Sequence, residues 1–296
     1  GIIVKSTTGT GLTIGSNSGA MSNSQTKYNN QGDVNIIGGS TTGTAALNIS
    51  YGTIENNGKI TLDNGVGIYG VNGSKLVNNT TVDITSNGVG MAAFASAQNL
   101  QNYGTDAKIL TATLTSTDKV LEIENNGILT VNGNSSVGLY GEINDIAGTN
   151  ILTSSNGSIT NNSKIIMTGD NSVGILSKRA IVNLGGTGSS DIITGTEGIG
   201  VYAENSTVNI ISNTGIEIKD KGTGIFVKNG SNVVGSTFEI KYTGGASETG
   251  VGIFYEGALS SNMVNSTNIN IINNGSSKGV VGIFANNDVE KKTEIC

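Results

Sequence analysis

The sequence contains no histidine, no tryptophan and no proline, and its only arginine is Arg179. Without histidine the chain cannot form a Ser-His-Asp triad or a histidine-ligated metal site, and a single arginine offers little for clamping phosphate. Proline would remove a backbone donor, so its absence is typical of a chain in which nearly every N–H joins a hydrogen-bonded ladder. We therefore expect extensive β-structure, no metal and no cofactor.

The single cysteine, Cys296, is the last residue and cannot form an internal disulfide. Its simplest interpretation is an added handle, and the alternative is a reactive or lipid-bearing thiol. A formal net charge of -6 disfavours nucleic acid, which needs a basic surface. No apolar run approaches the roughly 18 residues of a membrane span, and the first residues lack the features of a signal peptide. We expect an internal segment of a larger protein.

Glycine is abundant, with 45 copies, and many of these residues belong to a recurring motif of glycine, an aliphatic residue and usually an aromatic residue. The second glycine of each copy is Gly67, Gly90, Gly138, Gly174, Gly200, Gly224, Gly252 or Gly282. The steps between copies are 23, 48, 36, 26, 24, 28 and 30 residues, and we interpret the step of 48 as two turns. Such a period is typical of a stacked repeat.

Short triplets with a polar residue between two aliphatic residues recur within each repeat, as in Val34-Asn35-Ile36 and Val82-Asp83-Ile84. This alternation predicts short half-buried strands. Residues 224–242 predict three strands, at 224–227, 232–234 and 237–242, separated by corners. Asn-Gly pairs are also typical of the hairpins of an antiparallel meander, but the same strand sequence recurs only once per repeat. Intrinsic disorder is a further alternative, which the aliphatic content disfavours.

The predicted fold is therefore all-β, a right-handed parallel β-helix of about eleven turns with three short strands per turn. Residues 1–296 form one segment of a larger body, and residues 288–296 are a tail outside the repeat. Two irregular stretches, 91–120 and 141–160, are either degenerate turns or loops that leave the rod. Insertions in repeat proteins gather on one face, often the binding face.

Aromatic residues fall at one place in the repeat and are the candidate binding residues. We expect them to point outward or to lie at a corner, as a platform for sugar rings or a protein partner, or as a structural stack. The candidates in this row are Tyr69, Tyr140, Tyr202, Phe226, Phe254 and Phe284, and Phe94 of the irregular stretch 91–120 is a further candidate.

Asparagine pairs at recurring corners predict a ladder of stacked amides or, alternatively, a polar surface for a sugar. The pairs are Asn56-Asn57, Asn78-Asn79, Asn125-Asn126, Asn161-Asn162 and Asn273-Asn274.

Two features of the sequence are compatible with catalysis or with metal binding. Glycoside hydrolysis needs two carboxylates about 5 to 9.5 Å apart, and the candidate pairs are Asp191 with Glu197 and Glu217 with Glu239. Solvated surface carboxylates are the simpler interpretation. Residues 185–192 partly match a glycine- and aspartate-containing calcium repeat, with one residue too many and no second copy, so a plain loop is favoured.

Residues 56–62 (Asn-Asn-Gly-Lys-Ile-Thr-Leu), followed by 65–70 (Gly-Val-Gly-Ile-Tyr-Gly), resemble passenger domains of large autotransporter (type V secreted) adhesins, most closely those of fusobacteria. The resemblance extends over residues 30–287. It implies a β-helix that is exported through a C-terminal outer-membrane barrel and displayed on the bacterial surface.

That resemblance implies attachment to host cells or other bacteria through a surface glycan or protein. Separately, the acidic net charge predicts no nucleic-acid partner, and we expect a monomeric chain. Membrane association would come only through the barrel, which this chain lacks. Two alternatives stay open: a polysaccharide hydrolase or lyase, and a pure spacer for a distal binding domain. We expect no catalytic residue in this segment.

Overall fold

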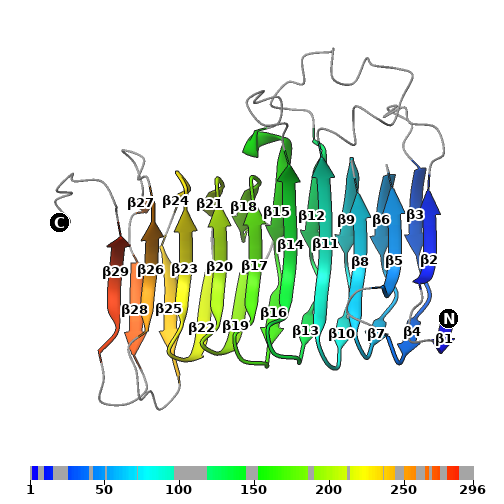
Figure 1. The fold of residues 1–296 in the computed structure, drawn as a ribbon, viewed down its shortest axis with the longest axis horizontal. Coiled ribbons are helices and arrows are strands. Elements are labelled where there is room, and N and C mark those ends of the chain that lie inside the picture. Colours follow the sequence, from blue (N-terminus) through cyan, green and yellow to red (C-terminus); the bar gives the residue numbers. More distant parts are fainter. Residues whose placement is uncertain are drawn as a thin grey trace.

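A computed structural model describes residues 2–5, 10–15, 26–39, 43–50, 52–71, 73–96, 119–144, 153–185, 190–211, 214–235, 237–243, 250–257, 264–266, 269–273 and 279–286. Within these residues the fold is a parallel β-helix, as predicted. The chain coils along one axis, and the coils nearest the two ends of the sequence lie at opposite ends of the rod (Figure 1). The short helix η1 (Ser154–Asn156) is the one helical element in this part of the chain.

Three sheets form the rod, and each coil contributes one strand to each sheet in turn. Sheet A contains β1 (Ile2–Lys5), β4 (Val34–Ile37), β7 (Ile60–Leu62), β10 (Val82–Ile84), β13 (Leu129–Val131), β16 (Lys164–Met167), β19 (Ser190–Thr196), β22 (Thr214–Asp220), β25 (Phe238–Tyr242) and β28 (Ile269–Asn273). Sheet B contains β2 (Thr10–Gly15), β5 (Ala45–Ser50), β8 (Gly65–Val71), β11 (Gly88–Ser96), β14 (Val137–Asn144), β17 (Val173–Lys178), β20 (Ile199–Glu204), β23 (Thr223–Lys228), β26 (Val251–Glu256) and β29 (Val281–Asn286). Sheet C contains β3 (Thr26–Asn30), β6 (Gly52–Asn56), β9 (Ser74–Asn78), β12 (Leu121–Asn125), β15 (Gly157–Asn161), β18 (Ile181–Leu184), β21 (Thr207–Ile210), β24 (Asn232–Gly235) and β27 (Val264–Ser266).

Each strand pairs in parallel with its equivalents one coil before and one coil after. Inner strands therefore use their N–H and C=O groups on both edges, which is consistent with the absence of proline from the sequence. The unit predicted from residues 224–242 is confirmed as β23, β24 and β25.

The number of coils differs from the prediction. In the described residues sheets A and B each contain ten strands, against the expected eleven or so turns. The step of 48 residues is one coil and not two, because β11 pairs directly with β14 and Met91 lies opposite Leu139. The extra length of this coil includes residues 97–118, which lie outside the described part of the chain.

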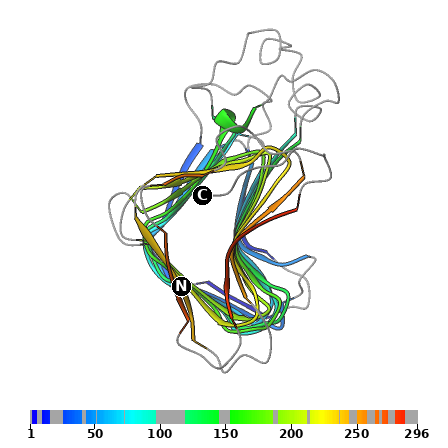
Figure 2. The same ribbon diagram turned by 90° about the vertical axis from the view of Figure 1, so that its left-hand side faces the viewer.

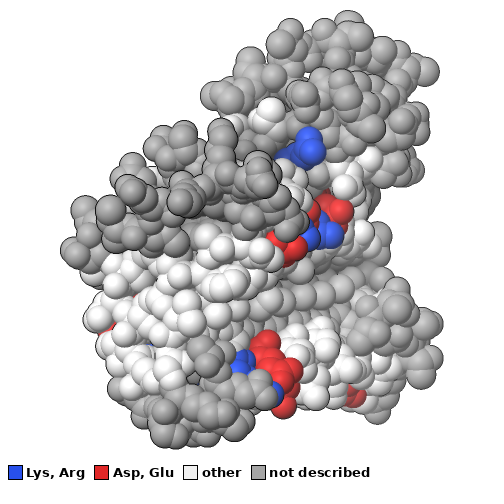
Figure 3. Space-filling view, turned by 60° about the vertical axis from the view of Figure 1, so that its left-hand side comes forward, with Lys and Arg blue, Asp and Glu red and all other residues white. Residues whose placement is uncertain are grey.

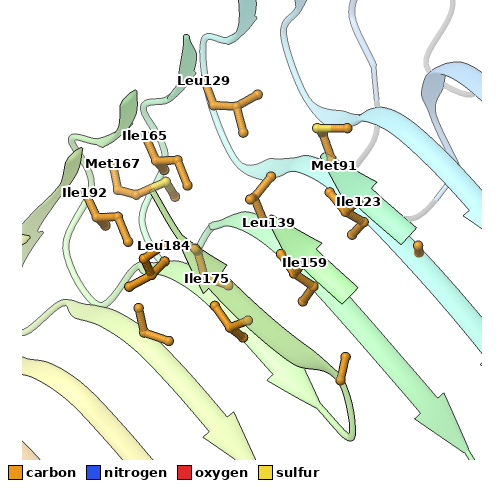
Figure 4. Packing of buried hydrophobic residues seen from close by; sticks show 14 of the residues in the cluster. Met91, Ile123, Leu129, Leu139, Ile159, Ile165, Met167, Ile175, Leu184 and Ile192 are labelled. Carbon is orange, nitrogen blue, oxygen red and sulfur yellow. The ribbon is translucent and has the colours of Figure 1, made fainter. Parts of the chain in front are cut away.

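The core consists of aliphatic side chains that point inward from all three sheets and stack in register (Figure 4). Met91, Leu139 and Ile175 form one such column on sheet B. Leu129, Ile165 and Ile192 form another on sheet A, and Ile123 stacks on Ile159 in sheet C. These layers bury the two aliphatic residues of each triplet, and the polar residue between them faces outward.

Buried asparagines replace aliphatic residues at the end of sheet C in five successive coils, and here the predicted amide ladder is confirmed. The Nδ2 of Asn30, Asn56, Asn78 and Asn125 each donates to the Oδ1 of the asparagine one coil further on, at 2.7, 3.0, 3.0 and 2.8 Å. The ladder ends at Asn161, whose Nδ2 donates to the Ser163 carbonyl oxygen at 2.7 Å.

A second, exposed ladder runs beside the buried one with the opposite donor direction. The Nδ2 of Asn57, Asn79, Asn126 and Asn162 each donates to the asparagine one coil back, at 2.6 to 3.0 Å. Asn273 does not belong to either ladder, because it ends β28 in sheet A and lies opposite Tyr242. Four of the five predicted asparagine pairs thus form hydrogen bonds from coil to coil along one corner of the rod.

Candidate functional site

A column of glycines bends sheet B inward along the rod. In β8 both Gly67 and Ile68 are buried, although neighbouring residues of a regular strand face opposite sides. A Cβ on Gly67 would lie 2.5 Å from the Gly90 carbonyl oxygen and 2.6 Å from Cγ1 of Val82 in sheet A. The next six glycines of the column, Gly90 to Gly252, show the same approach of 2.5 or 2.6 Å to the glycine carbonyl of the following coil.

This column explains why the second glycine of the motif recurs: the strand passes too close to its neighbours for any side chain. The resulting bend makes the outer face of sheet B concave when the rod is viewed from its end (Figure 2). The same face is hollowed in the space-filling view, with charged side chains gathered on both sides of the hollow (Figure 3).

Two rows of outward side chains flank the bend and form what we call the sheet B groove. The residue before each column glycine is aliphatic in seven of eight coils and is in register with its equivalents. This aliphatic row contains Val66, Val89, Val137, Val173, Ile199, Thr223, Val251 and Val281. Most of its members are half-buried, and Val281 is exposed.

The aromatic row lies two residues after the column glycine and contains the predicted binding residues. Tyr69, Tyr140, Tyr202, Phe226 and Phe254 are half-buried, and Phe284 is 44% exposed. The register residues between Tyr69 and Tyr140, and between Tyr140 and Tyr202, are Ala92 and Leu176. The prediction that these rings share one outward line is therefore confirmed.

Phe94 completes the row from a different position. It lies two residues beyond Ala92 on the same side of β11, and its ring packs between Tyr69 and Tyr140 with centroid distances of 5.8 and 4.9 Å. The small side chain of Ala92 leaves the space that Phe94 fills. A ring from a neighbouring register position thus restores the continuity of the stack.

Tyr202, Phe226 and Phe254 present their edges outward, because their faces cover one another. Tyr202 and Phe226 are 5.2 Å apart with an interplanar angle of 13°, and Phe226 and Phe254 are 4.8 Å apart at 9°. A sugar ring stacks on an exposed aromatic face, which these inner rings do not offer. The groove is therefore suited to aliphatic and aromatic groups that pack against ring edges.

Charged residues alternate along the upper border of the groove, two residues beyond the aromatic row. In register these are Glu142, Lys178, Glu204, Lys228 and Glu256. Lys178 Nζ lies 3.9 Å from Glu142, and Lys228 Nζ lies 3.5 Å from Glu256. The border is nearly balanced in charge and does not select strongly for a charged ligand.

Two tyrosines link the rings to this border. The Tyr202 hydroxyl donates to Glu204 at 3.3 Å, and the Tyr140 hydroxyl donates to Glu142. Partial burial, followed by the nearby Glu204 carboxylate, raises the pKa of Tyr202 to about 12. Burial and Glu142 raise the pKa of Tyr140 as well. Both phenols thus remain neutral donors at physiological pH.

Of the two predicted carboxylate pairs, the structure separates one and places the other beside a common hollow. Asp191 lies within β19 on sheet A, whereas Glu197 lies in the corner after it and pairs with Lys221 at 2.7 Å, so the two acids are not brought together. Glu217 and Glu239 lie on adjacent strands and line a common hollow, although Glu239 is in register with Gly215 and not with Glu217.

Several expectations concern residues outside the described part of the chain. These are the calcium-like loop at 186–189, residues 97–118 and 145–152 of the two irregular stretches, the tail at 288–296 and Cys296. In the second stretch, residues 141–144 belong to β14 and residues 157–160 to β15. Residues 91–96 of the first irregular stretch belong to the regular strand β11. Among described residues no group of three or more acidic or sulfur ligands could hold a metal ion, and no helix there is long and apolar enough to cross a membrane.

Neither the aliphatic row nor the charged border was predicted from the sequence. The border had a readable signal, since a charged residue follows two positions after the aromatic register residue in five successive coils. The groove itself had no such signal in the sequence. Alternation of apolar and polar residues with period two does not reveal that a strand bends inward.

No protein-family model matches this chain, and neither a curated protein nor a solved structure matches it significantly.

Proposed function

We propose that this chain is a segment of a bacterial cell-surface adhesin, in which the parallel β-helix is the scaffold and the sheet B groove is the binding surface. The observation that carries the proposal is the pair of rows along the outer face of sheet B, which are apolar at every position from β8 to β29 except Thr223. Contiguous apolar surface that remains accessible to solvent usually marks an interaction site.

The proposed partner is a protein on a host cell or another bacterium that inserts apolar side chains into the groove. Ring edges and isopropyl groups complement such side chains, and aromatic residues dominate protein binding hot spots. The face-to-face stacking of Tyr202, Phe226 and Phe254 argues against sugar faces as ligands of this part of the groove. The chain itself is proposed to be monomeric and non-catalytic, and to act at the cell surface.

The proposal is tested with three valine-to-threonine substitutions in the groove, Val137→Thr, Val173→Thr and Val251→Thr. Thr223 occupies the same row, so threonine is compatible with the fold at these positions. Losing three methyl groups from an interface costs about 2 kcal/mol at roughly 0.8 kcal/mol per buried group, or about thirtyfold in affinity.

The matched control carries Val77→Thr, Ile181→Thr and Val234→Thr, which are half-buried outward residues of sheet C. Binding of labelled protein to epithelial and bacterial cells should fall with the groove variant and persist with the control. Equal binding by both would refute the groove as the binding surface, and no binding by the original chain would favour the spacer alternative.

One observation favours the carbohydrate-active alternative: Glu217 and Glu239 line a hollow together with Lys164 and Lys241. A paired carboxylate beside a lysine is the arrangement that a hydrolase or lyase would use. Release of reducing ends from mixed polysaccharides, abolished by Glu217→Gln or Glu239→Gln, would establish that function. We expect no release, because both acids lie on an open outer face.

A further inference from the structure

We propose that the hollow above Gly215 on the outer face of sheet A binds one unit of a neutral, hydroxyl-rich polysaccharide. This site lies on a different sheet from the groove and depends on different residues. The hollow has a volume of about 230 Å³ and is lined by Lys164, Asp191, Ile193, Glu217, Glu239 and Lys241.

The hollow exists because one side chain is missing from an outward row. In register, this row contains Lys164, Asp191, Gly215, Glu239 and Asn270. Gly215 interrupts it between two acids, and a Cβ there would have Asp191 Oδ1 as its nearest neighbour, at 3.2 Å. Unlike the column glycines of sheet B, Gly215 therefore faces open space and is not required by a close backbone contact.

The five charged residues around the hollow do not pair with one another. Lys164 is in register with Asp191, and Glu217 is in register with Lys241, yet none of the five forms a side-chain hydrogen bond or ion pair with another described residue. Elsewhere on the rod opposite charges on adjacent coils do pair, as in Lys228 with Glu256 at 3.5 Å and Lys27 with Glu55 at 3.2 Å. The polar groups of the hollow thus remain available to a ligand.

The residue types define the ligand class. Three carboxylates accept hydrogen bonds and two ammonium groups donate them, which suits a ligand whose hydroxyls do both. Three acids disfavour phosphate or another anion, and two lysines disfavour a simple cation. Half-buried Ile193 lies beside them in the row of Glu217 and offers an apolar contact. The volume equals roughly eight water molecules at about 30 Å³ each, which suits a single sugar ring.

The test is titration of the 296-residue chain with neutral gluco-, galacto- and manno-oligosaccharides. Binding is monitored by the amide NMR shifts and by calorimetry. We expect at least one series to bind, with shifts at Gly215 and its neighbours on β19 and β25. Gly215→Val fills the hollow and should weaken binding at least tenfold. Glu239→Gln keeps the shape but removes a charged acceptor and should weaken binding three- to tenfold.

The control is Asn35→Val, an outward position of the same sheet six strands away, which should leave binding unchanged. The proposal is overturned if no neutral oligosaccharide binds at millimolar concentration, if Gly215→Val and Glu239→Gln both leave binding intact, or if only arginine or lysine amides bind. The groove variants of sheet B should not alter oligosaccharide binding, so failure of this site and failure of the adhesin proposal are distinguishable.

Discussion

Replacing a column glycine with alanine should destabilise the rod far more than the same change at an outward glycine. In β20 a Cβ on Gly200 would lie 2.6 Å from the Gly224 carbonyl oxygen and 2.5 Å from Cγ2 of Ile216. Neither obstacle can easily move, because the carbonyl belongs to the adjacent backbone of sheet B and Ile216 is a buried, β-branched residue of sheet A. Overpacking of this kind costs typically 1–3 kcal/mol, and we expect Gly200→Ala to lower the free energy of unfolding by about 3 kcal/mol.

Gly215→Ala is the matched control. Neither glycine has φ in the left-handed region, so the backbone accepts alanine at both positions. At Gly215 the only near atom is the carboxylate end of Asp191, which can rotate away. Alanine then reduces the conformational freedom of the unfolded chain, and we expect a gain of about 0.4–1 kcal/mol.

Urea unfolding followed by circular dichroism measures both changes, and amide exchange at Gly224 and Ile216 locates the damage of Gly200→Ala. The expected difference between the variants is about 3–4 kcal/mol. Equal stability of Gly200→Ala and Gly215→Ala would refute the argument that backbone proximity selects glycine in sheet B.

Two further perturbations test the asparagine ladders and the tyrosines of the groove. Asn78→Ala leaves the amide groups of Asn56 and Asn125 buried without their partner and should cost about 2–4 kcal/mol in unfolding free energy, whereas the exposed Asn79→Ala should cost less than about 1 kcal/mol. Tyr202, with its pKa raised to about 12, should be about one-tenth ionised at pH 11, where an ordinary tyrosine is about nine-tenths ionised. Because the unfolded chain releases this proton near pH 10 and the folded chain holds it longer, this contribution to stability is present below pH 10 and is lost as the pH rises through 12. Absorbance at the tyrosinate band should show one late-titrating tyrosine fewer in Tyr202→Phe, since burial also raises the pKa values of Tyr140, Tyr242 and Tyr255. An unchanged late titration in Tyr202→Phe would contradict the environment assigned to Tyr202.

The sequence was sufficient to predict the direction of stacking and the strand triplets, because Val34-Asn35-Ile36 and its equivalents show which side chains face inward. It also placed the aromatic residues in one row. The step of 48 residues misled the count, since residue spacing alone does not distinguish an additional coil from an insertion. Only the register, in which Met91 meets Leu139, settles that question.

Neither the bend of sheet B nor the hollow on sheet A could be predicted from the sequence, and the reasons for the two are related. Regular alternation would place Gly67 and Ile68 on opposite faces, and nothing local indicates that a neighbouring carbonyl lies where a Cβ would be. The hollow depends on Gly215 lying between Asp191 and Glu239, which belong to different coils. Such contacts arise from the register between coils and not from the order of residues within one coil.

The glycine column links the stability of the rod to the shape of its proposed binding face. The bend that brings Gly67 against Val82 and the adjacent coil lies between the aliphatic row and the aromatic row, so both rows flank it. Any side chain at a column position would therefore disturb the core and the groove together. Binding measurements on glycine variants cannot separate the two effects, whereas outward changes such as Val173→Thr leave the column intact. Function on this face must accordingly be tested through the two rows, and stability through the column.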